Sequence, residues 1–390
     1  MPASPSTARV INDRSALELL QQEGPLTAGQ LKTLTGLSRP TVADLVERLQ
    51  LSGLIQVVGE SGSQRRGPNA RLYGIVADRA HLAALDVRTR SVTVVVADLL
   101  GTTLAEASLP IGSDTGTEPA VESAATLLER AVREAGATRL HSVGIGAPGL
   151  IDPVGGELRP TSGLPAWHRS LIGVLQDRLT ARVVVENETN LAAVAEQRLG
   201  AARDRDTFAF LWLGAGVGAG LVLDGRLRRG ASGGAGEIGF LPVPGTAGVP
   251  SAVDCDGGFH SLAGSAAICA LAAEYGVAAP MGAREPEAAG VVLAAVADGR
   301  DDFLGAVADR LALGAAAVAS VLDPGCVVLG GEVGHAGGPE LAGRVEARLA
   351  ELSPLRTQVR AGTLGGSAVL SGALLIARDT AQEELFAPSA

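Results

Sequence analysis

The sequence is poor in aromatic residues and cysteine, and it has no long hydrophobic run. Aromatic residues make up only 3% of the 390 residues, so the base-stacking platforms of single-stranded nucleic-acid binders are not expected. The three cysteines are too few for a disulfide framework. The longest largely apolar run, residues 311–322, is too short to span a membrane, and the first residues contain no hydrophobic signal region. We therefore expect a soluble, cytoplasmic protein with no membrane partner.

Glycine and acidic charge are abundant instead. There are 52 glycines and the net charge is −10, so a wholly basic nucleic-acid coat is not expected. Residues 1–80 hold nine Arg or Lys and seven Asp or Glu, a net of +2, whereas the remainder holds 23 and 35, a net of −12. A small basic part joined to an acidic body indicates separate domains. We place these domains at residues 1–77, 78–190 and 191–390.

The N-terminal part has the helix spacing of a winged helix-turn-helix domain. A helical apolar stripe runs through residues 12–24. Thr27 and Gln30 form the pattern of a capping box, which predicts a second, short helix. Ser38 is placed to cap a third and longer helix. A helix, a short helix, a turn containing glycine and a longer helix are typical of DNA-binding helix-turn-helix modules.

Two strands after these helices complete the winged module. They are expected at residues 54–58 and 70–75 and flank a polar loop that carries two adjacent arginines, suited to a phosphate backbone or a minor groove. Outward positions at the start of the third helix are those from which a recognition helix contacts base edges. The alternative is a protein-interaction module with a solvated loop. The residues that we expect to bind double-stranded operator DNA are Ser38, Arg39, Pro40, Thr41, Asp44, Arg65 and Arg66.

The rest of the chain predicts an α/β fold in which one pattern occurs twice. Three β-rich runs within residues 81–110 form an antiparallel meander, and helices then alternate with strands up to residue 199. Strands at residues 208–213 and 218–223 begin a second series, which closes with a final helix from Ser367. This repetition indicates two similar lobes with a cleft between them.

Five segments of this body give the sequence a family resemblance. They are Val143-Gly-Ile-Gly-Ala-Pro-Gly-Leu-Ile-Asp152, Val185-Glu-Asn-Glu-Thr-Asn190, Leu213-Gly-Ala-Gly-Val-Gly-Ala-Gly-Leu-Val-Leu-Asp-Gly225, Gly236-Glu-Ile-Gly239 and Val327-Val-Leu-Gly-Gly-Glu332. In this order, and with a winged helix-turn-helix in front, they resemble the ROK family of repressors, open reading frames and sugar kinases. The resemblance covers nearly the whole chain and implies a two-lobed, actin-like ATPase (ribonuclease H-like) fold.

Kinases of this family transfer a phosphoryl group from ATP, but four positions here depart from their pattern. Their first phosphate loop, Asp-x-Gly-Gly-Thr-Lys, is Asp86-Val-Arg-Thr-Arg-Ser91, which lacks both glycines and gains two arginines. Their second loop, Gly-Thr-Gly, is Gly214-Ala-Gly216, and Glu332 adds a carboxylate near the expected adenine site. Glu188 replaces the aspartate base, and a base displaced by about 1 Å costs on the order of 10²-fold in rate. We predict no enzyme activity, no cofactor and a degenerate base position at Glu188.

The resemblance also implies a sugar site, which is partly preserved. Asn187, Glu188 and Glu237 match family positions that hydrogen-bond sugar hydroxyls. Gly163 stands where the family has the asparagine of Asn-Leu-Pro-Gly-Trp, and Phe240 stands where a histidine is expected. The alternatives are that Glu237 caps a local amide and that Asn187 forms a turn through its own side chain. The candidate effector-binding residues are Gly163, Asn187, Glu188 and Glu237.

Many relatives also carry a zinc motif, Cys-x-Cys-Gly-x-x-Gly-Cys, of which residues 253–260 retain little. Only Cys255 fits the motif, and His260 is a weak second candidate. Because two ligands do not make a closed tetrahedral site, we predict no metal and expect Cys255 to fill space.

These features predict a transcriptional regulator, most simply a repressor, of sugar uptake or catabolism genes. Its kinase-like body is expected to sense a sugar or sugar derivative, and the resemblance implies a homodimer or homotetramer. Two alternatives stay open: an ATP-dependent sugar kinase with an appended DNA-binding domain, and a regulator without an effector.

Overall fold

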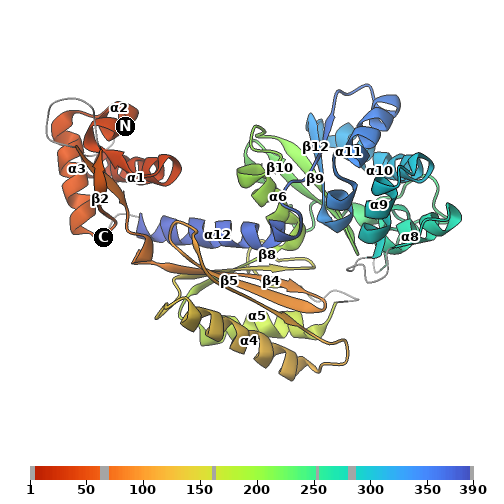
Figure 1. Cartoon of the computed structure of the whole chain (residues 1–390), viewed down its shortest axis with the longest axis horizontal. Helices are drawn as coiled ribbons and strands as arrows, with labels where there is room; N and C mark the ends of the chain where they lie inside the picture. The colour runs from red at the N-terminus through yellow and green to blue at the C-terminus, as the bar shows by residue number, and fades with distance from the viewer. Residues whose placement is uncertain (1–4, 62–69, 160–163, 252–253, 280–286, 387–390) are drawn as a thin grey trace.

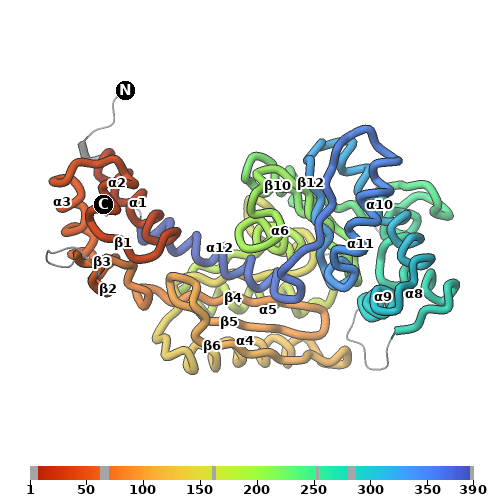
Figure 2. Tube along the Cα trace, turned by 45° about the horizontal axis from the view of Figure 1, so that its top comes forward, coloured from red at the N-terminus to blue at the C-terminus, as the bar shows by residue number. Residues whose placement is uncertain are grey.

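A computed structural model describes residues 5–61, 70–159, 164–251, 254–279 and 287–386. The chain forms a head (residues 5–75) and a body of two lobes. Figures 1 and 2 show the head and the second lobe at opposite ends of the molecule, with the first lobe between them. The predicted class, a winged helix-turn-helix ahead of a two-lobed α/β body, is confirmed.

The head packs three helices against a three-stranded sheet of order β1-β3-β2. The predicted capping box is present, because the Thr27 side chain accepts from the Gln30 backbone N–H and the Gln30 side chain accepts from that of Thr27. Ser38 Oγ accepts from the Thr41 backbone N–H at 3.3 Å and caps the third helix, as expected. The first strand, which pairs with β3, was not predicted. The elements are α1 (Pro5–Glu23), β1 (Leu26–Thr27), α2 (Ala28–Thr35), α3 (Arg39–Leu51), β2 (Ile55–Ser61) and β3 (Ala70–Ile75).

The first lobe is a five-stranded sheet of order β6-β5-β4-β7-β8. Its first three strands pair antiparallel as the predicted meander, and the last two join in parallel. Helices α4 and α5 cover one face of this sheet, and the C-terminal helix covers the other (Figure 1). The elements are β4 (His81–Arg88), β5 (Ser91–Asp98), β6 (Thr103–Pro110), α4 (Thr117–Glu134), β7 (Ser142–Ala147), α5 (Ala166–Arg178) and β8 (Arg182–Asn187).

The second lobe repeats this plan with the order β11-β10-β9-β12-β13, which confirms the predicted repetition. Three short helices (α7 to α9) and strands β11 and β13 were not predicted. Helix α11 begins at Gly331, before the expected start near Pro339, and bends at Gly338. The elements are α6 (Glu188–Leu199), β9 (Phe208–Leu213), β10 (Val217–Leu223), β11 (Arg226–Leu227), α7 (His260–Ala263), α8 (Ser265–Glu274), α9 (Glu287–Ala297), α10 (Asp301–Leu322), β12 (Cys326–Gly330), α11 (Gly331–Leu352) and β13 (Gln358–Ala361).

Helix α10 is 22 residues long and apolar enough, by length and composition, to cross a membrane. It packs against α11, and Phe303, Leu311 and Ala315 are fully buried in the second-lobe core. This burial is typical of a core helix in a water-soluble domain.

The C-terminal helix α12 (Ala368–Leu385) packs mainly on the first lobe, although it follows the second lobe in the sequence. Its place in the chain puts it with the second lobe, but it packs on β4 and β7 of the first lobe and on α6. Gly144 permits the close approach, because a Cβ there would lie 2.0 Å from the Ala373 carbonyl oxygen. The far end of α12 enters the core of the head, where Ala381 and Phe386 are buried with Leu17. One helix therefore runs from the body into the head (Figure 1).

Candidate functional site

The carboxyl ends of three parallel strands of the first lobe bring polar residues together. The register places Asp86 of β4 beside Gly146 of β7, and Gly146 beside Glu186 of β8. Ligands of parallel α/β sheets bind at such strand ends. The second lobe contributes Glu332, in the first turn of α11 directly after β12. We define the interlobe site as Asp86, Arg88, Asn187, Glu188 and Glu332.

Arg88 connects the two lobes through its guanidinium group. Its Nε donates to Asp86 Oδ2 at 2.8 Å, and its Nη1 donates to Glu332 Oε1, also at 2.8 Å. Asp86 is buried, and the side chains of Arg88 and Glu332 are 33% and 23% exposed, so solvent screens these pairs only partly. Charge-assisted hydrogen bonds in such surroundings are stronger than exposed ones. A protein side chain thus holds the first phosphate loop to the second lobe.

The residues present do not fit the phosphates of a nucleotide. A Cβ placed on Gly214, in the second phosphate loop, would lie 2.5 Å from Glu332 Oε2, so the carboxylate occupies the space beside this loop. The single positive charge of Arg88 is already shared by two carboxylates, which leaves this trio with a net negative charge. Phosphate oxygens would meet repulsion there. The sequence placed Glu332 near an adenine site, whereas the structure places it beside the phosphate loops.

The surroundings of Glu188 favour the protonated form of its carboxyl group. Burial, together with repulsion from Asp86 and Glu332, raises the pKa of Glu188 to about 8. Burial likewise raises the pKa of Asp86, although Arg88 opposes this. A general base must be unprotonated to accept a proton. The raised pKa favours the protonated carboxyl of Glu188, which can donate a hydrogen bond to a ligand.

Asn187 has a structural role in addition to any contact with a ligand. Its Oδ1 accepts from the backbone N–H groups of Thr189 and Asn190 and caps α6, while its Nδ2 donates to the Gly149 carbonyl at 2.9 Å. These are the local bonds of the alternative considered for this residue. They hold Asn187 rigidly next to Glu188, at the start of α6.

Glu237 lies in another part of the second lobe, just before a 3₁₀ turn at Ile238–Phe240. Its side chain keeps contact with solvent, although the loops around it remove enough water to raise its pKa. The neighbouring loop contacts the first lobe, since a Cβ on Gly233 would meet the Ile151 carbonyl oxygen. Gly163 lies outside the described residues. A shared binding role for Glu237 and Glu188 remains a prediction.

The remnant of the zinc motif gives no metal centre in the part of the chain that the structure describes, where no group of three or more metal-ligating side chains occurs. Cys255 is half-buried, and it is the only residue of the described stretch that fits the cysteine positions of the motif. His260 begins the short helix α7. The donor set therefore does not fit the zinc ion implied by the family motif.

Two residues close to the interlobe site, outside the set defined above, were missed by sequence reasoning. Arg229, from the second lobe, forms an ion pair with buried Glu186 of the first lobe, with Nε and Oε2 2.5 Å apart. His168 is buried beside the Arg88 backbone and edge-on to the Trp167 ring, and burial lowers its pKa to about 4. The only sequence signal for His168 was its position directly after the segment ending in Trp167. Arg229 gave no signal, because its partner is fixed by the fold.

Of the expected DNA-binding residues at the start of α3, some have exposed side chains and others are already bonded within the protein. Ser38, Arg39 and Pro40 are exposed, and Arg39 has no ion-pair partner among the described residues. The Thr41 hydroxyl is bonded to Ser38 Oγ at 2.7 Å. The Asp44 carboxylate pairs with Arg48, one turn along α3. Arg65 and Arg66 lie outside the described residues.

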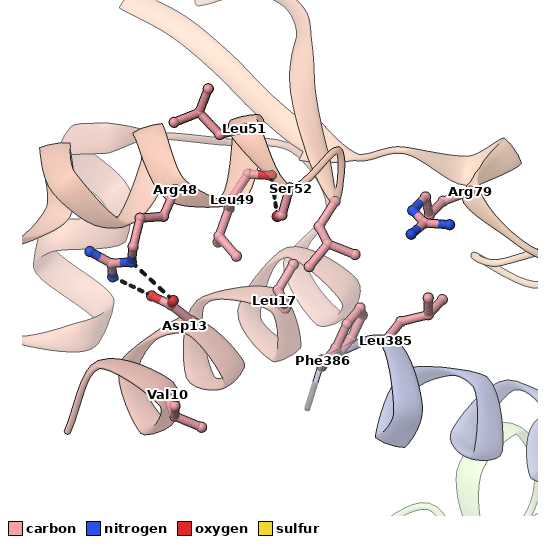
Figure 3. Close-up of a pocket in the computed structure, with 11 residues that line it drawn as sticks. Val10, Asp13, Leu17, Arg48, Leu49, Leu51, Ser52, Arg79, Leu385 and Phe386 are labelled. Carbon is pink, nitrogen blue, oxygen red and sulfur yellow. Dashed lines mark hydrogen bonds and ion pairs between the residues drawn. The ribbon is translucent and has the colours of Figure 1, made fainter. Parts of the chain in front are cut away.

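A cavity of about 370 Å³ lies where the head meets the end of α12 (Figure 3). Leu17 of α1, Leu49 of α3 and Phe386 line it, and Arg48 pairs with Asp13 at its edge with a separation of 2.6 Å. The C-terminal half of α3 is thus tied to α1 and faces the end of α12 across this cavity.

Comparisons with known proteins agree with this architecture. The ROK family model matches residues 82–380, and a winged helix-turn-helix DNA-binding model matches residues 11–56. The chain is 26% identical over 237 residues to the xylose repressor of Caldicellulosiruptor bescii, covering 60% of this chain and 59% of that protein. It is 27% identical over 241 residues to the DNA-binding transcriptional dual regulator NagC of Escherichia coli, covering 60% and 57%. The chain thus spans less than two thirds of the length of either relative.

Two solved structures resemble the whole chain or its body. A ROK family transcriptional regulator, a homologue of the E. coli MLC protein, aligns with a TM-score of 0.77 at 22% identity and covers 97% of this chain and 98% of its own. The ROK hexokinase of Thermus thermophilus aligns with a TM-score of 0.61 at 27% identity, covering 77% of this chain and 99% of its own. The sheet order, the five sequence segments and the match over residues 82–380 lead to one conclusion: this chain belongs to the ROK family.

Proposed function

We propose that this protein is a DNA-binding repressor of sugar uptake or catabolism genes, and that its body binds a sugar or sugar derivative without phosphorylating it. The observation that carries the proposal is the Arg88 bridge to Glu332, in a chain that also has a winged helix-turn-helix head. Arg88, at one end of the bridge, stands at a position of the first phosphate loop in the family pattern. The relatives named xylose repressor and NagC support the same function. We place the protein in the cytoplasm, where operator DNA is accessible.

Phosphoryl transfer is disfavoured by both charge and protonation. The trio of Asp86, Arg88 and Glu332 has a net negative charge where phosphates would lie. The raised pKa of Glu188 favours its protonated form, in which it cannot accept a proton. The same groups suit a polyol, because hydroxyls need both donors and acceptors when buried. A binding site without turnover is the simplest use of this arrangement.

Binding between the lobes has a physical route to the DNA-binding head. A ligand that changes the angle between the lobes would move α6 against α12, and α12 continues into the head core at Ala381 and Phe386. In a homodimer or homotetramer, two heads must match half-sites about 34–36 Å apart. A small rotation of each head would break this match and release the operator.

A binding experiment tests the proposal directly. Fluorescence anisotropy with DNA from upstream of the protein's own gene and neighbouring sugar genes should detect specific binding. A panel of xylose, N-acetylglucosamine, glucose and other free sugars should contain one that weakens binding. DNA binding that no sugar or phosphosugar changes would favour a regulator without an effector. Absence of specific DNA binding would overturn the proposal.

The second candidate function is an ATP-dependent sugar kinase with a DNA-binding head, which the similarity to the T. thermophilus hexokinase favours. A coupled assay of ADP release across the same sugars separates the two functions. We expect no turnover. Turnover that Glu188→Gln abolishes would establish the kinase and contradict the repressor with a sensing body.

A further inference from the structure

A second cavity lies on the head–body junction, bounded by α1 of the head, α6 and α12. Its volume is about 590 Å³, and every lining side chain except Phe386 is polar or charged. The cationic lining residues are Arg14 of α1, Arg198 of α6 and Arg378 of α12. This composition differs from the apolar lining that most drug-sized ligand sites have. A polar ligand would fit it better.

Two of the three arginines in this cavity already have carboxylate partners. Arg198 forms a two-pronged pair with Asp379, with separations of 2.7 and 2.8 Å. Arg14 pairs with Glu18 at 2.9 Å. These charges cancel in pairs.

Arg378 differs from the other two. Its Nε is buried and has no hydrogen-bond partner, and none of its nitrogens forms an ion pair within the described residues. Its Nη1 lies against the β5–β6 turn, 3.6 Å from where a Cβ on Gly101 would be. Burial lowers the pKa of Arg378; attraction to Asp379 partly opposes this, and weaker repulsion from Arg198 adds to it. Glu383 also lines the cavity but is exposed and forms no pair with Arg378.

An unpaired guanidinium is costly when it is withdrawn from water. Proteins normally compensate such a charge with a carboxylate, and here the carboxylate of Asp379 is committed to Arg198. A planar guanidinium matches the oxygens of a phosphate or carboxylate group in a two-pronged hydrogen bond. A phosphate or carboxylate group is therefore the kind of ligand that would pair with Arg378.

We propose that this cavity is a binding site for a small oxyanion, such as a phosphorylated or carboxylated metabolite, held by Arg378. Because α1 forms one wall and α6 and α12 form the others, the bound anion contacts the head and the body together. Gln382 Nε2 already donates to Gln21 Oε1 across this junction at 3.0 Å. The anion would strengthen the attachment of the head to α12. The site is separate from the interlobe site, which contains none of its lining residues.

Binding is measured on the full-length protein by calorimetry and by thermal unfolding, at constant ionic strength set with NaCl. The probes are inorganic phosphate, citrate, glucose 6-phosphate and free glucose. At least one of the three anions should raise the unfolding temperature and bind saturably. Phosphate binding alone indicates a free-ion site, and much tighter binding of glucose 6-phosphate or of citrate indicates the metabolite class. Free glucose, which lacks the oxyanion, should not bind there.

Variants of Arg378 decide whether this residue is the binding group. Arg378→Met should weaken anion binding by roughly 10-fold to 100-fold, as expected for losing a hydrogen bond to a charged group. Arg178→Met, which removes an arginine on α5 outside the cavity, should leave it unchanged. Without anions, Arg378→Met should unfold at the same or a higher temperature, because an uncompensated charge is removed. If Arg378→Met fails to fold, Arg378→Lys serves instead, since it keeps the charge without the two-pronged geometry and should still weaken binding. The proposal is overturned if no anion binds at constant ionic strength or if the Arg378 variant binds it as the native protein does.

Discussion

Arg88 and Glu332 are 244 positions apart in the sequence, yet Nη1 of the arginine lies 2.8 Å from Oε1 of the glutamate. This contact joins the first strand of one lobe to the start of α11 in the other. In the kinases of this fold, phosphates would lie in the corresponding place. An internal ion pair here holds the lobes together without a nucleotide.

Removal of Arg88 should therefore loosen the body. In Arg88→Met, Asp86 and Glu332 lose their shared cation. We expect the free energy of unfolding in urea to fall by about 1–3 kcal/mol. This is less than for a fully buried pair, because the arginine is partly solvated. Arg178→Met, in an exposed pair with Glu122, should change it little. Equal destabilisation by the two variants would show that the bridge contributes no more than a surface pair.

Glu188 should make the stability depend on pH. Its pKa is raised to about 8 in the folded protein, above its ordinary value of 4.5, so between these values the folded state binds one more proton than the unfolded state. The stability contribution of this carboxyl is present below pH 4.5 and is lost as the pH rises towards 8. Glu188→Gln should remove this pH dependence. Between pH 4.5 and 8, the free energy of unfolding measured in urea should therefore rise for the variant relative to the native protein. Glu129→Gln, exposed on α4, is the control, and parallel curves for native protein and Glu188→Gln would contradict the assignment.

Arg65 and Arg66 remain predicted wing contacts. Replacing both by alanine should weaken binding to all DNA sequences alike, because phosphate contacts carry no sequence information. The slope of log K against log[salt] should become shallower by about 0.9 for each lost phosphate contact. Arg182→Ala, an exposed arginine of the body, should leave both quantities unchanged. Anisotropy titrations at several salt concentrations measure the slope, and an unchanged slope would remove these residues from the interface.

Glu237 is predicted to act on the ligand and not on DNA. Glu237→Ala should leave operator affinity intact while reducing the response to the inducing sugar, because a hydrogen-bonding carboxylate is lost far from the head. The measurement is DNA binding with increasing sugar. An induction curve that coincides with that of the native protein would exclude Glu237 from the site.

Much of the local structure followed from sequence patterns. The caps at Thr27 and Ser38 lie within three residues of their partners, so the sequence alone specifies them. The longer strands of the two lobe sheets followed from β-rich apolar runs, and their repetition gave the two lobes. The elements α7 to α9, β11 and β13 were missed. Strands β11 and β13 and helix α7 have only two to four residues, and α8 and α9, with 10 and 11 residues, are so rich in alanine and other apolar residues that they show no clear period.

The interlobe site was foreseen in its residues but not in its connections. The loss of glycines after Asp86 predicted a blocked phosphate loop. It did not indicate that Glu332 would be the partner of Arg88. For Asn187, the local bonds of the alternative are present, and they cap α6. Such pairings depend on which strand ends meet.

The amino-acid sequence by itself determined the caps, the alternation of strands and helices, the family and the replacement of a glycine loop by arginines, because each of these is encoded by neighbours along the chain. Only the tertiary structure decided that Arg88 joins the two lobes and that α12 leaves the second lobe to enter the head. Both depend on packing between segments hundreds of residues apart, where close approach at Gly144 and burial of Phe386 outweigh sequence proximity.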